Sequence, residues 1–183
     1  MPTQASRIEY RLEDYVDHDR SSYYDAVSVI GMIEHVGLGG YPQFFSKIHR
    51  LLKPGGKALI HTIVSPSPSV PSNRWIDKHI FSGGYTPSIS ELTRAAEKQP
   101  FRITCLFVYE PRHYRKTIEC WLSNFERNAP MLRSYLFQVE HTEREVSRMM
   151  RTWMFYLSGV RNMFLEGEGS HQVVQLCLER LRH

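Results

Sequence analysis

Three side chains that can do acid–base chemistry stand where apolar runs of this sequence end. Glu34 follows the apolar run Tyr24–Ile30, and His61 lies near the end of the run Ala58–Val64. Tyr114 stands at the start of a long helical pattern. A carboxylate accepts protons, a neutral imidazole can give or accept one, and a phenol donates hydrogen bonds to negative groups. Ligands of open α/β sheets bind beyond the strand ends, so these residues are candidates for one site.

Each of the three residues also has a plainer interpretation. Glu34 lies at a turn flanked by glycines, where a carboxylate can cap the helix that follows. His61 can be a hydrogen-bonded core histidine, and Tyr114 can be an aromatic residue on the surface of an amphipathic helix. The residues alone leave both interpretations open.

The elements that would position these residues form a strand–helix–strand unit. Alternation predicts a strand over Ile8–Leu12, and the continuous apolar run Tyr24–Ile30 predicts a strand buried on both faces. A helical pattern opens at Gly39-Gly40 and is stopped by the turn Lys53-Pro54-Gly55-Gly56. Ala58–Val64 predicts a second buried strand. Such a unit implies a parallel sheet with a right-handed crossover.

The second half of the chain follows a Pro- and Ser-rich connector at 65–72. Ser88 and Glu91 have capping-box spacing, which predicts a helix to about Lys98, and Phe101–Tyr109 predicts a strand. The remaining segments are helical over His113–Arg127, broken at Pro130, helical over Glu140–Leu165, and either strand or helix over Gln172–Leu181. The predicted fold class is therefore α/β with a helical insertion before the final element.

The composition excludes several classes of protein. The 183 residues fit one domain, and the net charge of +4 is scattered apart from a cluster at Arg112, Arg115 and Lys116, which argues against a nucleic-acid partner. Three cysteines lie far apart, so we expect reduced thiols and no metal site. No apolar run is long enough for a signal peptide or a transmembrane segment, so we expect a cytoplasmic protein that meets lipid from outside the membrane.

Five ordered motifs resemble those of the cyclopropane-fatty-acyl-phospholipid synthase family, which includes mycolic-acid cyclopropane synthases. The likeness extends over about Ile8–Phe164, and its first motif, in Tyr24–Gly37, resembles the family's fourth strand and G-M-hydrophobic-E-H-V-G turn. The others are Leu51-Leu52-Lys53-Pro54-Gly55-Gly56, His61-Thr62-Ile63, Trp75–Phe81 with Gly83-Gly84 and Pro87-Ser88, and His113-Tyr114-x-x-Thr117-Ile118. One such motif alone would carry little weight, but five in order indicate common ancestry.

The resemblance implies methyl transfer from S-adenosylmethionine to the cis double bond of a phospholipid acyl chain, with closure to a cyclopropane ring. It implies that residues 1–183 are the C-terminal part of the methyltransferase domain, a partial class I (Rossmann-like) sheet lacking its first strands. In the family a bicarbonate ion serves as base, and the matching positions here are Glu34, His61, Tyr114 and the backbone of Ile63. The insertion, about 112–165, would cover the acyl chain.

The family's glycine-rich cofactor loop has no counterpart before Ile8, and only Asp14 and Tyr15 match the neighbourhood of the adenine. A missing N-terminal segment or a homodimer would have to complete the site. The resemblance also implies a position peripheral to the membrane. The alternative is a truncated, non-catalytic homologue that binds lipid or a full-length partner; a third candidate is a methyltransferase with another apolar substrate. The Met and aromatic residues after Met149 are either core or part of a lipid channel.

Overall fold

A mixed four-stranded sheet organises the molecule. The computed structural model describes residues 8–68, 73–139, 142–167 and 169–182. In the order of the sheet, the strands are β1 (Tyr24–Ile30), β2 (Leu52–Val64), β4 (Gln172–Arg180) and β3 (Phe101–Tyr109). β1 and β2 are parallel, as the strand–helix–strand unit predicts, but β4 lies antiparallel between β2 and β3. The sheet is therefore only partly parallel, and the final segment is a strand.

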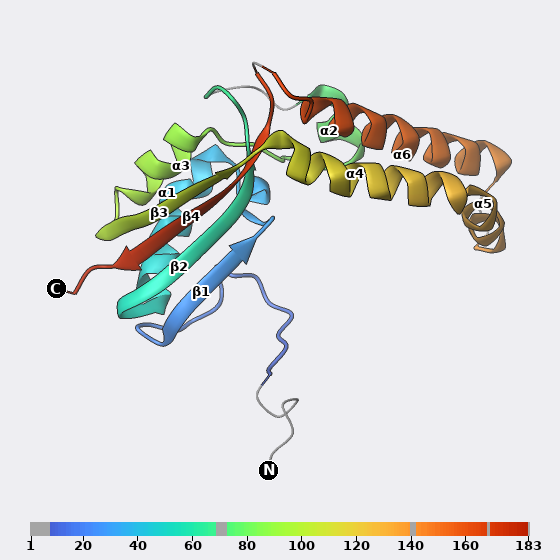
Figure 1. Ribbon diagram of the computed structural model, residues 1–183. Coiled ribbons are helices and arrows are strands. Elements are labelled where there is room, and N and C mark those ends of the chain that lie inside the picture. The colour runs from blue at the N-terminus through green and yellow to red at the C-terminus, as the bar shows by residue number, and fades with distance from the viewer. Residues whose placement is uncertain (1–7, 69–72, 140–141, 168, 183) are drawn as a thin grey trace, which may run out of the picture.

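Two helices cover one face of this sheet, α1 (Tyr41–Leu51) and α3 (Ile89–Ala96) (Figure 1). The main core lies between them and the alternate residues of the strands that point toward this face. Its largest fully buried side chains include Tyr41, Phe44, Phe45, Leu52, Ile60 and Leu92. Ser88 and Glu91 form the predicted capping box, which fixes the start of α3.

Short elements lead into and out of the main unit. Two single-turn 3₁₀ helices, η2 (Ile33–His35) and η3 (Leu38–Gly40), connect β1 to α1. The short helix α2 (Arg74–His79), which the periodicity does not predict, is capped by the side chain of Asn73. These turns hold the segment that carries Glu34 against the end of β2.

A helical arm extends from one end of the sheet (Figure 1). It consists of α4 (Pro111–Arg127), α5 (Ala129–Gln138) and α6 (Glu143–Met163), and it confirms a helical insertion before the last element. Pro130 lies in the first turn of α5, where proline is tolerated. The residue predicted to break the helical pattern therefore lies at the start of a further helix. A second apolar cluster, formed by Ile118, Val160, Phe164 and Val173, joins the arm to the sheet.

One predicted strand is absent, and the predicted burial of another is wrong. The segment Ile8–Leu12 forms no strand: Tyr10 is 91% and Leu12 107% exposed, and no other described residue pairs with them. β1 is a strand as predicted, but only Val29 within it is buried. The reason is its place at the edge of the sheet, where the described residues provide one neighbouring strand only.

None of the described helices is long and apolar enough to cross a bilayer. Among the same residues, no group of three His, Cys, Asp or Glu side chains is placed to hold a metal ion. The three cysteines carry free thiols.

Candidate active site

Glu34 connects the turn after β1 to the end of β2. Its Oε1 atom accepts a hydrogen bond of 3.0 Å from the backbone N–H of Ile63, and its own carbonyl accepts one of 2.8 Å from Tyr85 N–H. Its Oε2 atom is buried and has no hydrogen-bond partner among the described residues. Glu34 therefore does not cap α1, and half of its carboxylate can still receive a hydrogen bond.

His61 lies in β2, on the sheet face opposite to α1 and α3. It stands between Ile30 of β1 and Gln175 of β4 in the strand register, and its carbonyl accepts a hydrogen bond from Gly31 N–H. The Nδ1 atom of its half-buried ring lies 3.3 Å from Nε2 of Gln175. The turn that leads to Glu34 thus begins beside His61. Gly31 makes this turn with a φ of 60°, which glycine adopts without strain.

Tyr114 approaches this region from α4. Its ring packs on Phe164 at 4.9 Å between centroids, and it belongs to the apolar cluster that also includes Ile63. Burial, and then the negative charge of Glu34, raise the pKa of its phenol above the ordinary value. Tyr114 is therefore a partly buried residue close enough to sense Glu34, and its phenol stays protonated at neutral pH.

Two further tyrosines, Tyr41 near Glu34 and Tyr156 near Tyr114, lie in this region and were not predicted. Tyr41 is fully buried at the start of α1, and its hydroxyl has no partner among the described residues. Burial, and next the charge of Glu34, raise the pKa of Tyr41 well above its usual range. Burial and neighbouring Tyr114 raise the pKa of Tyr156 to about 12. No motif points to these roles, because both residues fit the apolar faces of predicted helices.

The backbone of Ile63 is already engaged. Its N–H serves Glu34, and its carbonyl accepts a 3.1 Å hydrogen bond from the hydroxyl of Thr62. Ile63 therefore positions the carboxylate of Glu34 in this structure. Ile63 lies in β2 and packs against the apolar cluster that joins the arm to the sheet.

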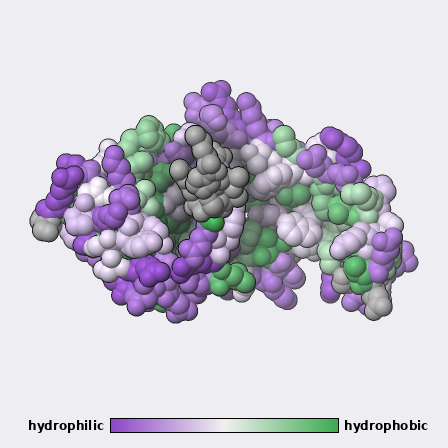
Figure 2. Space-filling model, turned by 90° about the horizontal axis from the view of Figure 1, so that it is seen from below, coloured by the Kyte–Doolittle hydropathy of each residue, from purple (hydrophilic) through white to green (hydrophobic). Residues whose placement is uncertain are grey.

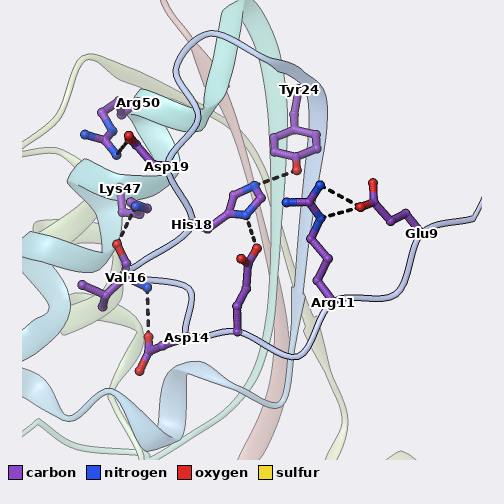
Figure 3. A network of polar contacts seen from close by, with 10 residues as sticks. Glu9, Arg11, Asp14, Val16, His18, Asp19, Tyr24, Lys47 and Arg50 are labelled. Carbon is purple, nitrogen blue, oxygen red and sulfur yellow. Dashed lines mark hydrogen bonds and ion pairs between the residues drawn. The ribbon is translucent and has the colours of Figure 1, made fainter.

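Asp14 and Tyr15 lie elsewhere, beside α1. The Asp14 carboxylate accepts a 2.9 Å hydrogen bond from Val16 N–H within its own turn (Figure 3). Tyr15 packs edge-on against Phe44 at 5.8 Å. A cavity of about 220 Å³ at this place is lined by Tyr15, Val16, Gln43, Ser46, Lys47 and Arg50. The structure does not bring these two residues together with Glu34, His61 and Tyr114.

A histidine ties this N-terminal segment to the sheet. His18 contacts Glu13 through Nδ1 and lies 2.8 Å from the hydroxyl of Tyr24 in β1 through Nε2 (Figure 3). Lys47 donates to the carbonyl of Val16, which adds a link to α1. The segment is thus held at the edge of the sheet by polar contacts, although it pairs with no strand.

Known proteins resemble this chain in sequence and fold. A family model described as mycolic acid cyclopropane synthetase matches residues 3–176. The cyclopropane-fatty-acyl-phospholipid synthase of Escherichia coli K12 is 30% identical over 158 residues, which are 84% of this chain and 37% of the relative. Cyclopropane mycolic acid synthase 3 of Mycobacterium tuberculosis is 31% identical over 156 residues, 78% of this chain and 51% of the relative.

A solved structure is similar to this chain in fold. Mycolic acid cyclopropane synthase CmaA1, complexed with SAH and CTAB, has a TM-score of 0.73 at 28% identity, over 90% of this chain and 57% of that chain. The fold is that of class I S-adenosylmethionine-dependent methyltransferases. Within that class, this chain belongs to the mycolic acid cyclopropane synthetase family. It spans between about a third and a half of the length of the curated relatives named above.

Proposed function

We propose that this chain forms the acid–base and acyl-binding part of an S-adenosylmethionine-dependent enzyme that converts cis double bonds of phospholipid acyl chains to cyclopropane rings. The observation that carries the proposal is the carboxylate of Glu34. One oxygen is fixed by Ile63, and the other is buried without a partner. A buried, unsatisfied carboxylate oxygen costs free energy unless a ligand supplies a hydrogen bond, so such atoms occur at functional sites.

A bicarbonate ion fits this place. Its hydroxyl can donate to Oε2 of Glu34, and Tyr114, protonated beside Glu34, can donate to its oxygens. His61 is the third side chain assigned to it by the family motif. Bound there, bicarbonate would supply a base for the proton lost on ring closure. The role of this chain's own residues is to orient that ion and to surround it with phenols and apolar groups that keep water away.

S-adenosylmethionine, which would supply the methyl group, fits the described residues only in part. The first glycine of the sequence is Gly31, so the printed residues before β1 hold no glycine-rich loop. Asp14 uses its carboxylate within its own turn. A complete cofactor site would therefore need residues beyond those described.

The helical arm provides apolar surface suited to acyl chains. Aromatic and Met side chains remain exposed on it: Trp121, Met131, Tyr135, Phe137, Trp153 and Phe155. Figure 2 shows hydrophobic surface gathered between the body and the arm and again at the end of the arm. These patches support an acyl-covering role for the insertion at about 112–165 and contact with a membrane surface. The Met and aromatic residues after Met149 differ in burial: Met150 is buried in the packing, whereas Phe155 is exposed.

The basic cluster near the start of α4 is largely neutralised. Arg112 pairs with Glu110, and Arg115 pairs with Glu119 at 2.8 Å. Little net positive charge remains there for a nucleic-acid backbone.

A non-catalytic role is the second candidate, favoured by the edge of β1 that no other strand among the described residues covers. In that case the chain would bind lipid, a second copy of itself or a full-length homologue. The first candidate requires S-adenosylmethionine to bind, and the second does not.

Two titrations of the purified chain test the proposal. Calorimetry with S-adenosylhomocysteine should give micromolar binding if the chain completes its own cofactor site; no binding by a cooperatively folded chain would favour the second candidate. In parallel, ¹³C NMR of labelled bicarbonate should show line broadening with the wild type but not with Glu34→Gln. Equal broadening with both proteins would contradict the bicarbonate site, whatever the result with the cofactor.

A further inference from the structure

A row of three polar side chains crosses the sheet beside the candidate site. His61 of β2 is paired in the register with Gln175 of β4, and Gln175 with Phe107 of β3. Two residues further along β3, Tyr109 reaches back to Gln175. The row lies on the face opposite to α1 and α3, where His61 also lies. Neither Gln175 nor Tyr109 belongs to the motifs that define the family resemblance.

The hydrogen bonds in this row have a definite direction. The Tyr109 hydroxyl donates to Oε1 of Gln175 at 3.0 Å. The amide nitrogen of Gln175 therefore faces His61 and lies 3.3 Å from Nδ1. In this arrangement the amide NH₂ group can donate only to an Nδ1 atom that carries no proton, and a neutral ring then carries its proton on Nε2.

We propose that Gln175, held by Tyr109, is a positioning residue that keeps His61 in its Nε2–H form. This would present a single N–H donor from His61 at the candidate site, suited to an anion such as bicarbonate. The row of contacts supports this tautomer. Its importance for turnover rests on the proposed function.

The surroundings of Tyr109 make the row rigid. Tyr109 packs against the apolar cluster formed by Ile118, Val160, Phe164 and Val173, and stacks edge-on with His113 at 5.8 Å. It is the last residue of β3, and α4 begins two residues later at Pro111. The position of the helical arm is thereby coupled to the orientation of the Gln175 amide, and through it to His61. Fixing a histidine's tautomer through the group on its other nitrogen is the usual means of orienting imidazoles at active sites.

The test is ¹⁵N NMR of histidine-labelled full chain, in which ring nitrogens with and without a proton have well separated shifts. The His61 signals are assigned by their loss in His61→Asn. Wild type should give a protonated Nε2 and an unprotonated Nδ1. Gln175→Glu offers an acceptor in place of the donor and should place a proton on Nδ1. Gln172→Glu makes the same substitution three residues away in β4 and should leave His61 unchanged.

A second variant keeps the inference falsifiable if Gln175→Glu folds poorly. Tyr109→Phe removes only the hydroxyl that orients the amide, so the neutral His61 ring should become a mixture of both tautomers. A wild-type ring protonated on Nδ1, or His61 signals that are unchanged in both variants, would overturn the inference.

An activity measurement distinguishes failure of this inference from failure of the proposed function. If the chain makes product, alone or together with a protein that completes its cofactor site, Gln175→Glu should lower turnover about tenfold or more while the KM for S-adenosylmethionine stays the same. Gln175→Asn should have a turnover between those of Gln175→Glu and wild type. Unchanged turnover in Gln175→Glu would overturn the positioning role even where the tautomer shifts. Absence of product from wild type would count against the proposed function only, because the NMR result does not depend on it.

Discussion

Glu34 joins two parts of the candidate site through the two oxygens of one carboxylate. Oε1 satisfies the backbone of Ile63, and Oε2 is left buried and unpartnered. Structural and functional roles can thus be separated by substitution at this residue, because they belong to different atoms.

The first prediction uses this separation. Glu34→Gln keeps an oxygen for the Ile63 N–H, so its free energy of unfolding should stay within about 1 kcal/mol of wild type. Glu34→Ala leaves that N–H without a partner and should lose about 1–3 kcal/mol. Urea denaturation followed by circular dichroism measures both. An equal loss of unfolding free energy in Glu34→Gln and Glu34→Ala would mean that the hydrogen bond to Ile63 N–H does not contribute to stability.

The second prediction concerns high pH. Burial and Tyr114 raise the pKa of Tyr156 from 10.0 to about 12 in the folded protein, so between these pH values the unfolded chain releases a proton that the folded chain retains. Stability from this group is present below pH 10 and is lost as the pH rises toward about 12. Tyr156→Phe should make the decline in Tm over that window shallower.

Tyr10→Phe is the matched control, because Tyr10 is 91% exposed. It should leave the decline unchanged. Thermal unfolding at several pH values from 9 to 12 gives the comparison, and identical slopes in wild type and Tyr156→Phe would contradict the prediction.

The sequence indicated Glu34, His61 and Tyr114 through motif resemblance, and the structure brings them to one end of the sheet. It could not indicate Tyr41, Tyr156 or Gln175. Their side chains read as ordinary members of helix faces or of a strand, and only tertiary packing gives them a carboxylate or an imidazole as neighbour. Asp14 and Tyr15 were tied to the site by similarity of position alone.

At the scale of elements, local rules worked where a local signal was complete. The capping box of Ser88 and Glu91 fixed the start of α3, and the limits of β3 agree with the prediction. Strand pairing, in contrast, depends on residues that are far apart in the sequence. Alternation at Ile8–Leu12 is compatible with a strand, but a strand needs a neighbour, and none is present among the described residues. The place of β4 between β2 and β3 could not be deduced from periodicity for the same reason.

Gly56, near the start of β2, yields the third prediction. A Cβ on Gly56 would lie 2.9 Å from the carbonyl oxygen of Lys53, 3.1 Å from that of Asp25 and 3.2 Å from that of Tyr24. Backbone atoms of two strands cannot move aside easily, so Gly56→Ala should destabilise the chain by about 1–3 kcal/mol.

Gly39→Ala serves as the control for Gly56→Ala. A Cβ at Gly39 meets nothing within 4 Å, and this substitution should be neutral or stabilise by less than about 1 kcal/mol through the unfolded state. Chemical denaturation of both variants checks the pair. Equal stability of the two would show that the approach of β1 and β2 at this turn is looser than the structure has it.

At the scale of the whole molecule, one edge of β1 pairs with no other strand among the described residues, and its Ile30 is 67% accessible. Such edges pair with other chains unless they are covered. We therefore expect the isolated chain to self-associate as its concentration rises. Ile30→Lys should weaken this association by at least a few-fold in sedimentation velocity while leaving the Tm nearly unchanged.

Phe155→Lys provides the contrast, because Phe155 is similarly exposed, at 64%, but lies on the arm. If this variant reduced association and Ile30→Lys did not, the arm would be the contact surface instead. A wild-type chain that stayed monomeric at high concentration would contradict the prediction for both surfaces.

The place of β4 has a consequence for how the protein is made. β4 is the last strand to be synthesised, yet it joins β3 to the rest of the sheet, and Arg180 within it bonds to Ser22 and to the carbonyls of His49 and Leu52. While the ribosome is still adding residues, β1, α1 and β2 can associate, but β3 has no strand beside it. The sheet closes only after Gln172–Arg180 has been synthesised, so the nascent chain must carry its exposed arm and an unpaired β3 until then.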